Sequence, residues 1–77
     1  PIVLELEPGA CSSEILPFEG EEFGYVLSGR LVLSVEGTDY PLKKGETFYL
    51  RGNHTHLLRN DSGSTGSVLW ISTPPAF

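Results

Sequence analysis

The sequence predicts an all-β domain, a small sandwich or barrel of about eight short antiparallel strands. Turn residues interrupt the chain at nearly even intervals, and short runs rich in Val, Leu, Ile, Phe and Tyr lie between them. Nowhere do apolar residues recur at the three-and-four spacing of a helix over ten positions. Short strands at regular spacing favour a closed architecture, because closure removes the exposed edges of a small sheet.

Each expected strand is a hydrophobic run bounded by turn residues such as Pro8-Gly9, Ser28-Gly29 and Lys44-Gly45. The run after Gly29 shows the strand period best, since alternate residues are apolar and point to one side. Gly24 indicates a bulge or the close approach of another stretch of backbone. The expected strands span residues 1–7, 13–17, 22–28, 30–36, 39–43, 46–50, 54–60 and 67–73.

The length of 77 residues limits the chain to a single domain, residues 1–77. A domain of this size buries only about 60% of the surface of its unfolded chain, so barrel closure or a partner subunit is expected to help. The chain begins at Pro1 and contains no Met. We therefore expect it to be part of a longer chain.

The formal net charge of −5 argues against binding of a phosphate backbone, which needs clustered cations. It favours binding of small molecules or proteins. The single cysteine, Cys11, cannot form an internal disulfide, which is typical of a reducing compartment such as the cytoplasm. No apolar run reaches the roughly 20 residues that a bilayer span needs.

Gly45, His56 and Asn60 are spaced as in the second motif of the cupin superfamily, G-x5-P-x-G-x2-H-x3-N, which this segment resembles. Arg51 stands in the place of the proline. Asn53 stands in the place of the second glycine, where asparagine tolerates a left-handed turn. The first cupin motif ends in E-x6-G, and Glu22 and Gly29 have this spacing, with fifteen residues between Gly29 and Gly45. The resemblance implies a cupin-type jelly-roll barrel.

The paired histidines of the first cupin motif are absent. One spacing of the motif puts Leu16 and Phe18 in their places, and the other puts Ile15 and Pro17 there. Of the four metal ligands that the resemblance implies, only Glu22 and His56 remain. Two ligands rarely hold a divalent ion, so we expect no resident metal or other cofactor.

His54 leaves a second hypothesis open. On a regular strand His54 and His56 would face the same side, and with Glu22 they could imitate a site of two histidines and one carboxylate. That arrangement would favour a metal-dependent enzyme, a dioxygenase or an isomerase. Alternatively, His54 belongs to the turn at 51–53 and its ring lies in solvent.

Without a metal, a carboxylate at Glu22 in a barrel mouth needs a cation or a hydrogen-bond donor. A ligand amine, Arg30, Arg51 or His56 could supply it. Phe18 would fill the space of a lost ligand histidine and make the pocket suit an organic molecule. The expected ligand-binding residues are therefore Glu22, His56, Arg30, Tyr49, Arg51 and Phe18.

Two further segments, residues 20–29 and 69–77, resemble the C-terminal cupin domain of bacterial regulators that carry an N-terminal helix-turn-helix of the lambda-repressor type. The resemblance implies that the cupin half senses a small molecule and forms a homodimer, while the half outside this chain binds DNA. We therefore favour a binding module for a polar or amine effector over an enzyme, with no nucleic-acid or membrane contact by this domain. A purely structural barrel without a ligand stays a third hypothesis.

Overall fold

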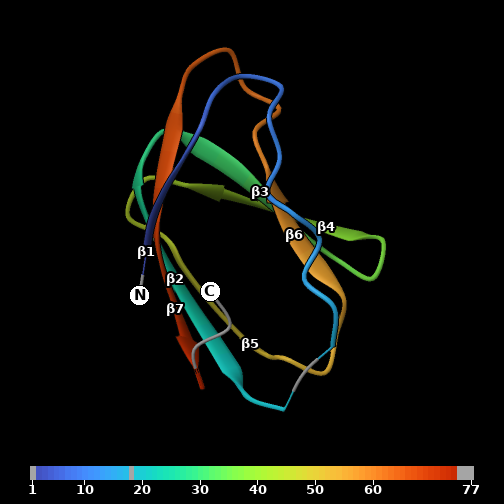
Figure 1. Ribbon diagram of the computed structural model, residues 1–77. Helices are drawn as coiled ribbons and strands as arrows, with labels where there is room; N and C mark the ends of the chain where they lie inside the picture. The colour runs from blue at the N-terminus through green and yellow to red at the C-terminus, as the bar shows by residue number, and fades with distance from the viewer. Residues whose placement is uncertain (1, 18, 75–77) are drawn as a thin grey trace.

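The computed structural model describes residues 2–17 and 19–74, and its regular elements in these ranges are seven β-strands. They form two antiparallel sheets that face each other (Figure 1). One sheet has the strand order β1-β7-β2-β5 and the other has the order β4-β3-β6. The strands are β1 (Ile2–Leu6), β2 (Glu21–Ser28), β3 (Arg30–Val35), β4 (Thr38–Lys43), β5 (Thr47–Arg51), β6 (His56–Arg59) and β7 (Gly66–Thr73). The predicted all-β class is confirmed, and no helix that could span a bilayer is present in the described ranges.

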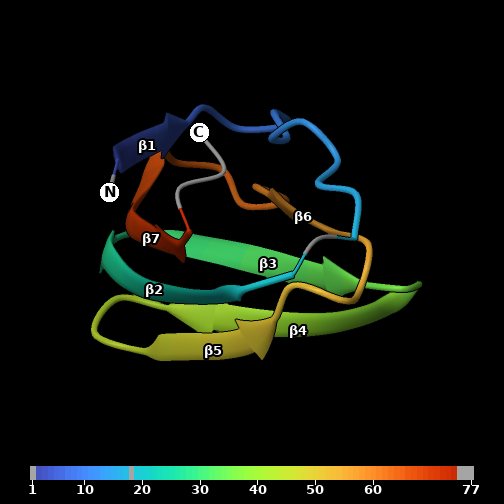
Figure 2. The ribbon, with the colours of Figure 1, turned by 60° about the horizontal axis from the view of Figure 1, so that its bottom comes forward.

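The strand expected at 13–17 is wrong. After β1 the chain crosses to the other sheet and runs beside β6 (Figure 2). It meets β6 only at two isolated bridges, Cys11 to Arg59 and Ile15 to His56. The residues between these bridges are polar and do not alternate, and Pro17 has no amide hydrogen to extend a ladder. The strand expected at 54–60 is shorter than predicted, because β6 begins at His56.

Seven buried hydrophobic residues from both sheets form the core: Leu6, Leu31, Leu33, Phe48, Leu58, Val68 and Trp70. The ring of Phe48 packs edge-on against Trp70 with 6.3 Å between the ring centroids. It also lies directly on Gly24, where an ideal Cβ would stand only 2.0 Å from Phe48 Cε2. The group that approaches Gly24 is therefore an aromatic side chain and not the backbone that the sequence led us to expect.

The turns define two ends of the molecule. The "Gly29 end" carries the turns before β3 and β5 and the loop 60–65, and the "His56 end" carries the turns at 36–37 and 52–55. Gly29 and Gly45 have positive φ values of 74° and 88°. The left-handed conformation expected at Asn53 is wrong. Among the described residues the left-handed non-glycine residue is Glu36, with φ 47°, in the two-residue hairpin Glu36-Gly37.

Candidate functional site

Glu22 and His56 meet inside the His56 end of the barrel. Glu22 lies on the inward face of β2, and His56 is the first residue of β6. Both side chains are fully buried, and His56 Nε2 lies against Glu22 Oε1 as an ion pair. Glu22 Oε2 has no hydrogen-bond partner among the described residues. Glu22 and His56, which the sequence assigned to one site, are thus in contact. The structure buries both of them away from solvent.

The backbone fixes the orientation of the His56 ring. His56 Nδ1 lies 2.7 Å from the carbonyl oxygen of His54. A carbonyl oxygen can only accept, so Nδ1 carries a hydrogen and donates it. Nε2 is thus the atom that faces Glu22. The two side chains form a buried polar pair inside the His56 end of the barrel.

His54 lies apart from the pair. It precedes β6 in the turn, its side chain is 45% exposed, and its Nδ1 is 3.0 Å from Glu36 Oε1. The alternative arrangement, with both histidines on one side of a regular strand, is not what the structure shows. No three His, Cys, Asp or Glu side chains in the described ranges come together to hold a metal ion. The site of two histidines and one carboxylate is not assembled here.

The donor set does not fit the four-ligand metal centre that the cupin resemblance implies. Ile15 and Leu16 carry hydrocarbon side chains, and Leu16 is 67% exposed. Glu22 and His56 are directed at each other. Two donors that already satisfy one another leave too few ligands for a tetrahedral or octahedral ion.

A cavity of about 570 Å³ opens between β4 and β5, beside the buried pair. Its wall includes Val35 and Leu50, which are the strand partners of His56 and Glu22 respectively. These aliphatic side chains thus stand next to the pair, and neither Glu22 nor His56 lines the cavity. The full lining is Leu33, Val35, Glu36, Thr38, Tyr40, Leu42, Thr47, Phe48, Tyr49, Leu50 and His54.

The polar groups of this cavity lie at its rim. Glu36 is the carboxylate among its described lining residues, and it is held by His54. Tyr49, an expected site residue, also lines the cavity. Its hydroxyl donates to Glu21, and this hydrogen bond raises the pKa of Tyr49 above its ordinary value of 10.0. Arg51 opposes part of this shift, so it lies near the same hydroxyl.

The remaining expected residues lie elsewhere. Arg30 begins β3 and lines a separate groove at the Gly29 end, far along the strand from Val35 and the buried pair. Arg51 is exposed at the end of β5, opposite Glu21, and is not among the residues that line the cavity. Phe18 lies outside the described residues.

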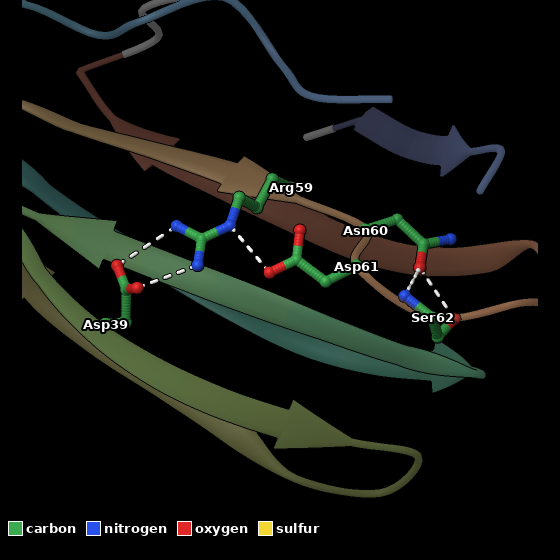
Figure 3. A network of polar contacts seen from close by, with 5 residues as sticks. All are labelled: Asp39, Arg59, Asn60, Asp61 and Ser62. Carbon is green, nitrogen blue, oxygen red and sulfur yellow. Dashed lines mark hydrogen bonds and ion pairs between the residues drawn. The ribbon is translucent and has the colours of Figure 1, made fainter. Parts of the chain in front are cut away.

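Asn60, the last residue of the second motif, organises the backbone (Figure 3). Its buried amide donates to the carbonyl oxygens of Leu6 and Ser64, both at 2.8 Å. Its Oδ1 accepts from the amide and the hydroxyl of Ser62 at 2.9 and 2.6 Å. One side chain therefore ties the loop 60–65 to β1.

Next to Asn60, Arg59 forms a surface network with two carboxylates (Figure 3). Its guanidinium donates two hydrogen bonds to Asp39, at 3.0 and 2.7 Å, and one to Asp61 at 2.9 Å. The hydrogen bond from Arg59 lowers the pKa of Asp39 below its ordinary value of 3.8. All three side chains are at least 31% exposed to solvent, so the network contributes little to stability.

Comparison with known proteins agrees with this geometry. The family model for the cupin domain matches residues 2–72. This chain belongs to the cupin family. A helix-turn-helix-type transcriptional regulator of Escherichia coli, PuuR, is 32% identical over 71 residues, which cover 92% of this chain and 38% of that protein. The cupin chain thus spans about two fifths of the length of this relative.

Other relatives support the same assignment. An uncharacterized protein of Methanocaldococcus jannaschii is 29% identical over 58 residues, 75% of this cupin and 46% of that protein. The solved cupin domain of an XRE family transcriptional regulator from Enterobacter cloacae superposes with a TM-score of 0.82 at 28% identity, over 91% of this chain and 75% of that one. A cupin barrel protein from Salinispora arenicola, at 21% identity and a TM-score of 0.82 over 91% and 58%, shares the fold. The chain is therefore similar to the cupin domains of transcriptional regulators.

Sequence reasoning missed most of the cavity wall. Leu33, Phe48 and Leu50 were not among the expected site residues, although their inward alternation on β3 and β5 is visible in the sequence. Glu36 was expected only as a strand end, and the signal that could have found it is the Glu-Gly pair of a two-residue hairpin. Its position beside His54 depends on the pairing of distant segments, which local patterns do not contain.

Proposed function

We propose that this chain is the effector-sensing and dimerisation domain of a bacterial transcriptional regulator that acts in the cytoplasm. Its similarity to a regulator over 92% of its length supports this role. The observation that carries the sensing function is the 570 Å³ cavity, because it has the size of a small-molecule site and joins apolar walls to a few polar groups at the rim.

The proposed effector is a small organic amine. Its hydrocarbon part would pack on Leu33, Phe48 and Leu50, and its ammonium group would pair with the carboxylate of Glu36. Glu36 is half-exposed and already bonded to His54, so an amine can replace the imidazole without uncovering a buried charge. The Glu22–His56 pair lies behind the aliphatic wall of the cavity and would not contact the ligand.

Calorimetric titration with a panel of diamines and polyamines tests this proposal. Glu36→Gln is expected to weaken binding about tenfold or more, because a charge-assisted hydrogen bond contributes about 1.5–3 kcal/mol and 1.4 kcal/mol corresponds to a factor of ten. Glu7→Gln is the matched control, since Glu7 is exposed and is not part of the cavity wall. Equal heats for Glu36→Gln and Glu7→Gln, or no heat with any amine, would contradict the amine effector.

The proposed dimer interface is the outer face of the four-stranded sheet. Five of its outward side chains are large, hydrophobic and well exposed: Val3 (61%), Phe23 (40%), Tyr25 (40%), Leu27 (38%) and Tyr49 (58%). Along the strands of a sheet with one face in solvent, hydrophobic side chains point inward and polar ones point outward. An outer face that is apolar therefore marks an interaction site.

A second copy of the chain fits this face best. Sheets pack face to face at an angle of about 30°, so two identical twisted faces can pair across a two-fold axis. The charged residues Glu21 and Arg51 are strand partners at the end of the face, where a two-fold arrangement leaves them at a polar rim. Pairing would also help a domain whose small core is of limited stability.

Tyr49 connects the two proposed surfaces. It lines the cavity, and on the outer face it is the strand partner of Phe23. An effector that moves the Tyr49 ring would change the packing of the dimer. The effector would then favour one of two dimer arrangements by its differential affinity for them.

Sedimentation or light scattering tests the interface. The protein is expected to be a dimer at micromolar concentration, and Phe23→Glu is expected to make it monomeric. Leu16→Glu is the control, because Leu16 is equally hydrophobic and 67% exposed but lies on the crossing segment. A monomeric wild-type protein, or equal effects of both substitutions, would contradict this interface.

We propose further that the domain works without a resident metal. The support is the donor set, in which Glu22 and His56 satisfy each other and His54 bonds to Glu36. Elemental analysis of protein purified without chelator tests the proposal. Stoichiometric iron, manganese, nickel or zinc would overturn it and favour a metal-dependent enzyme.

A further inference from the structure

A groove of about 550 Å³ at the Gly29 end gathers three of the five Lys and Arg side chains of the protein. Arg30, Lys43 and Lys44 line one part of it, and the loop residues Ser62, Gly63 and Ser64 line the other. No acidic residue is among its described lining residues, although the chain has ten Asp and Glu. Arg30 begins β3, Lys43 ends β4, and Lys44 follows directly after β4.

The sheet register makes this cluster costly without an anion. Arg30 and Lys43 are direct partners in the β3–β4 ladder. Like charges in directly opposite positions destabilise a sheet. Lys44 is fixed beside them, because its amide donates to the carbonyl oxygen of Gly29 at 3.0 Å.

The carboxylates of the adjoining groove are engaged elsewhere. Glu46 Oε1 accepts the backbone amide of Lys43 at 2.8 Å. Asp61 accepts from the guanidinium of Arg59 at 2.9 Å. Both residues line a neighbouring groove that shares Arg30 and Lys43, but each carboxylate already has a partner. Among the described residues, neither carboxylate forms an ion pair with Arg30, Lys43 or Lys44.

The loop that forms the other wall is held in place. Gly29 lies so close to it that an ideal Cβ would stand 2.7 Å from the carbonyl oxygen of Thr65. Asn60 accepts from Ser62 and donates to Ser64, which fixes the loop from inside. The walls of the groove are thus positioned by backbone contacts before any ligand arrives.

We propose that this groove binds the phosphate group of a small molecule. Arg30 supplies a planar fork that suits phosphate oxygens, and the two lysines supply point charges. The groove shares no lining residue with the effector cavity, so its test is independent of the proposed effector.

Titration with inorganic phosphate, followed by the amide NMR signals of Gly29, Lys44 and Gly63, tests the site. Saturable shifts of these signals are expected, with sodium chloride at equal ionic strength giving none. The double substitution Lys43→Gln and Lys44→Gln is expected to weaken binding tenfold or more. Arg51→Gln is the matched control, because it removes an exposed cation outside this groove.

Three results would overturn the proposal. The first is an equal loss of phosphate binding in the Arg51→Gln control, which would show only a general charge effect. The second is a linear shift without saturation, or the same shift with chloride. The third is a response of these amides to duplex DNA at far lower phosphate concentration than to inorganic phosphate, which would assign the groove to a nucleic-acid backbone.

Discussion

Replacing the buried Glu22–His56 pair by leucines, one at a time and together, gives the sharpest test of the barrel interior. Removing one partner of a buried pair leaves the other uncompensated and costs about 3–5 kcal/mol. Replacing both partners by apolar residues of similar volume is often neutral. We therefore expect Glu22→Leu and His56→Leu each to destabilise the domain by about 3–5 kcal/mol, and the double substitution to cost no more than either single one.

The size of this effect matters for a domain of 77 residues. At about 0.05–0.15 kcal/mol per residue, its total stability is about 4–12 kcal/mol, so each single substitution removes a large part of it. Both side chains are fully buried, so solvent does not screen the interaction.

Urea unfolding followed by Trp70 fluorescence measures the change. Trp70 is the only tryptophan, is 2% exposed, and has its ring 6.3 Å from the His56 ring. A double-mutant cycle then gives the coupling free energy between the two residues. A double substitution whose cost equals the sum of the single costs would refute the reasoning, because the two residues would then contribute independently.

Three further outcomes follow from other contacts. Gly24→Ala should lower stability by about 1–3 kcal/mol in urea unfolding, because the new Cβ would overlap the aromatic ring that packs there. Arg59→Gln should raise the pKa of Asp39 toward 3.8 in an NMR titration, and an unchanged pKa would argue against the pair. In the wild type the contribution of Asp39 to stability is full above pH 3.8 and is lost as the pH falls through the lower pKa of the folded state. Glu21→Gln should lower the pKa of Tyr49 toward 10.0 in an ultraviolet titration, and a pKa that stays raised would rule out the hydrogen bond as its cause. The contribution of this hydrogen bond to stability is full below pH 10 and is lost as the pH rises through the higher pKa of the folded state.

The sequence predicted the fold because the signals for it are local. Strand periodicity and turn glycines placed six of the seven strands within one residue of their observed bounds, and β6 within two. The strand β6 and the segment at 13–17 were predicted less well. His54 was expected within a strand. It lies instead in the turn at 52–55, outside the β-ladder, and its ring contacts Glu36. That pairing joins residues 18 positions apart, which no local pattern specifies.

The cupin motif residues of this chain divide by the kind of contact that they make. Gly29 allows the loop at Thr65 to approach closely, Gly45 adopts φ 88°, and Asn60 ties that loop to β1. These residues act on the backbone, so they are needed for the barrel whatever it binds. His56 and Glu22 act through side chains that here satisfy each other. A motif can therefore fix the fold while leaving its chemistry open, because the backbone contacts do not depend on what the side chains coordinate.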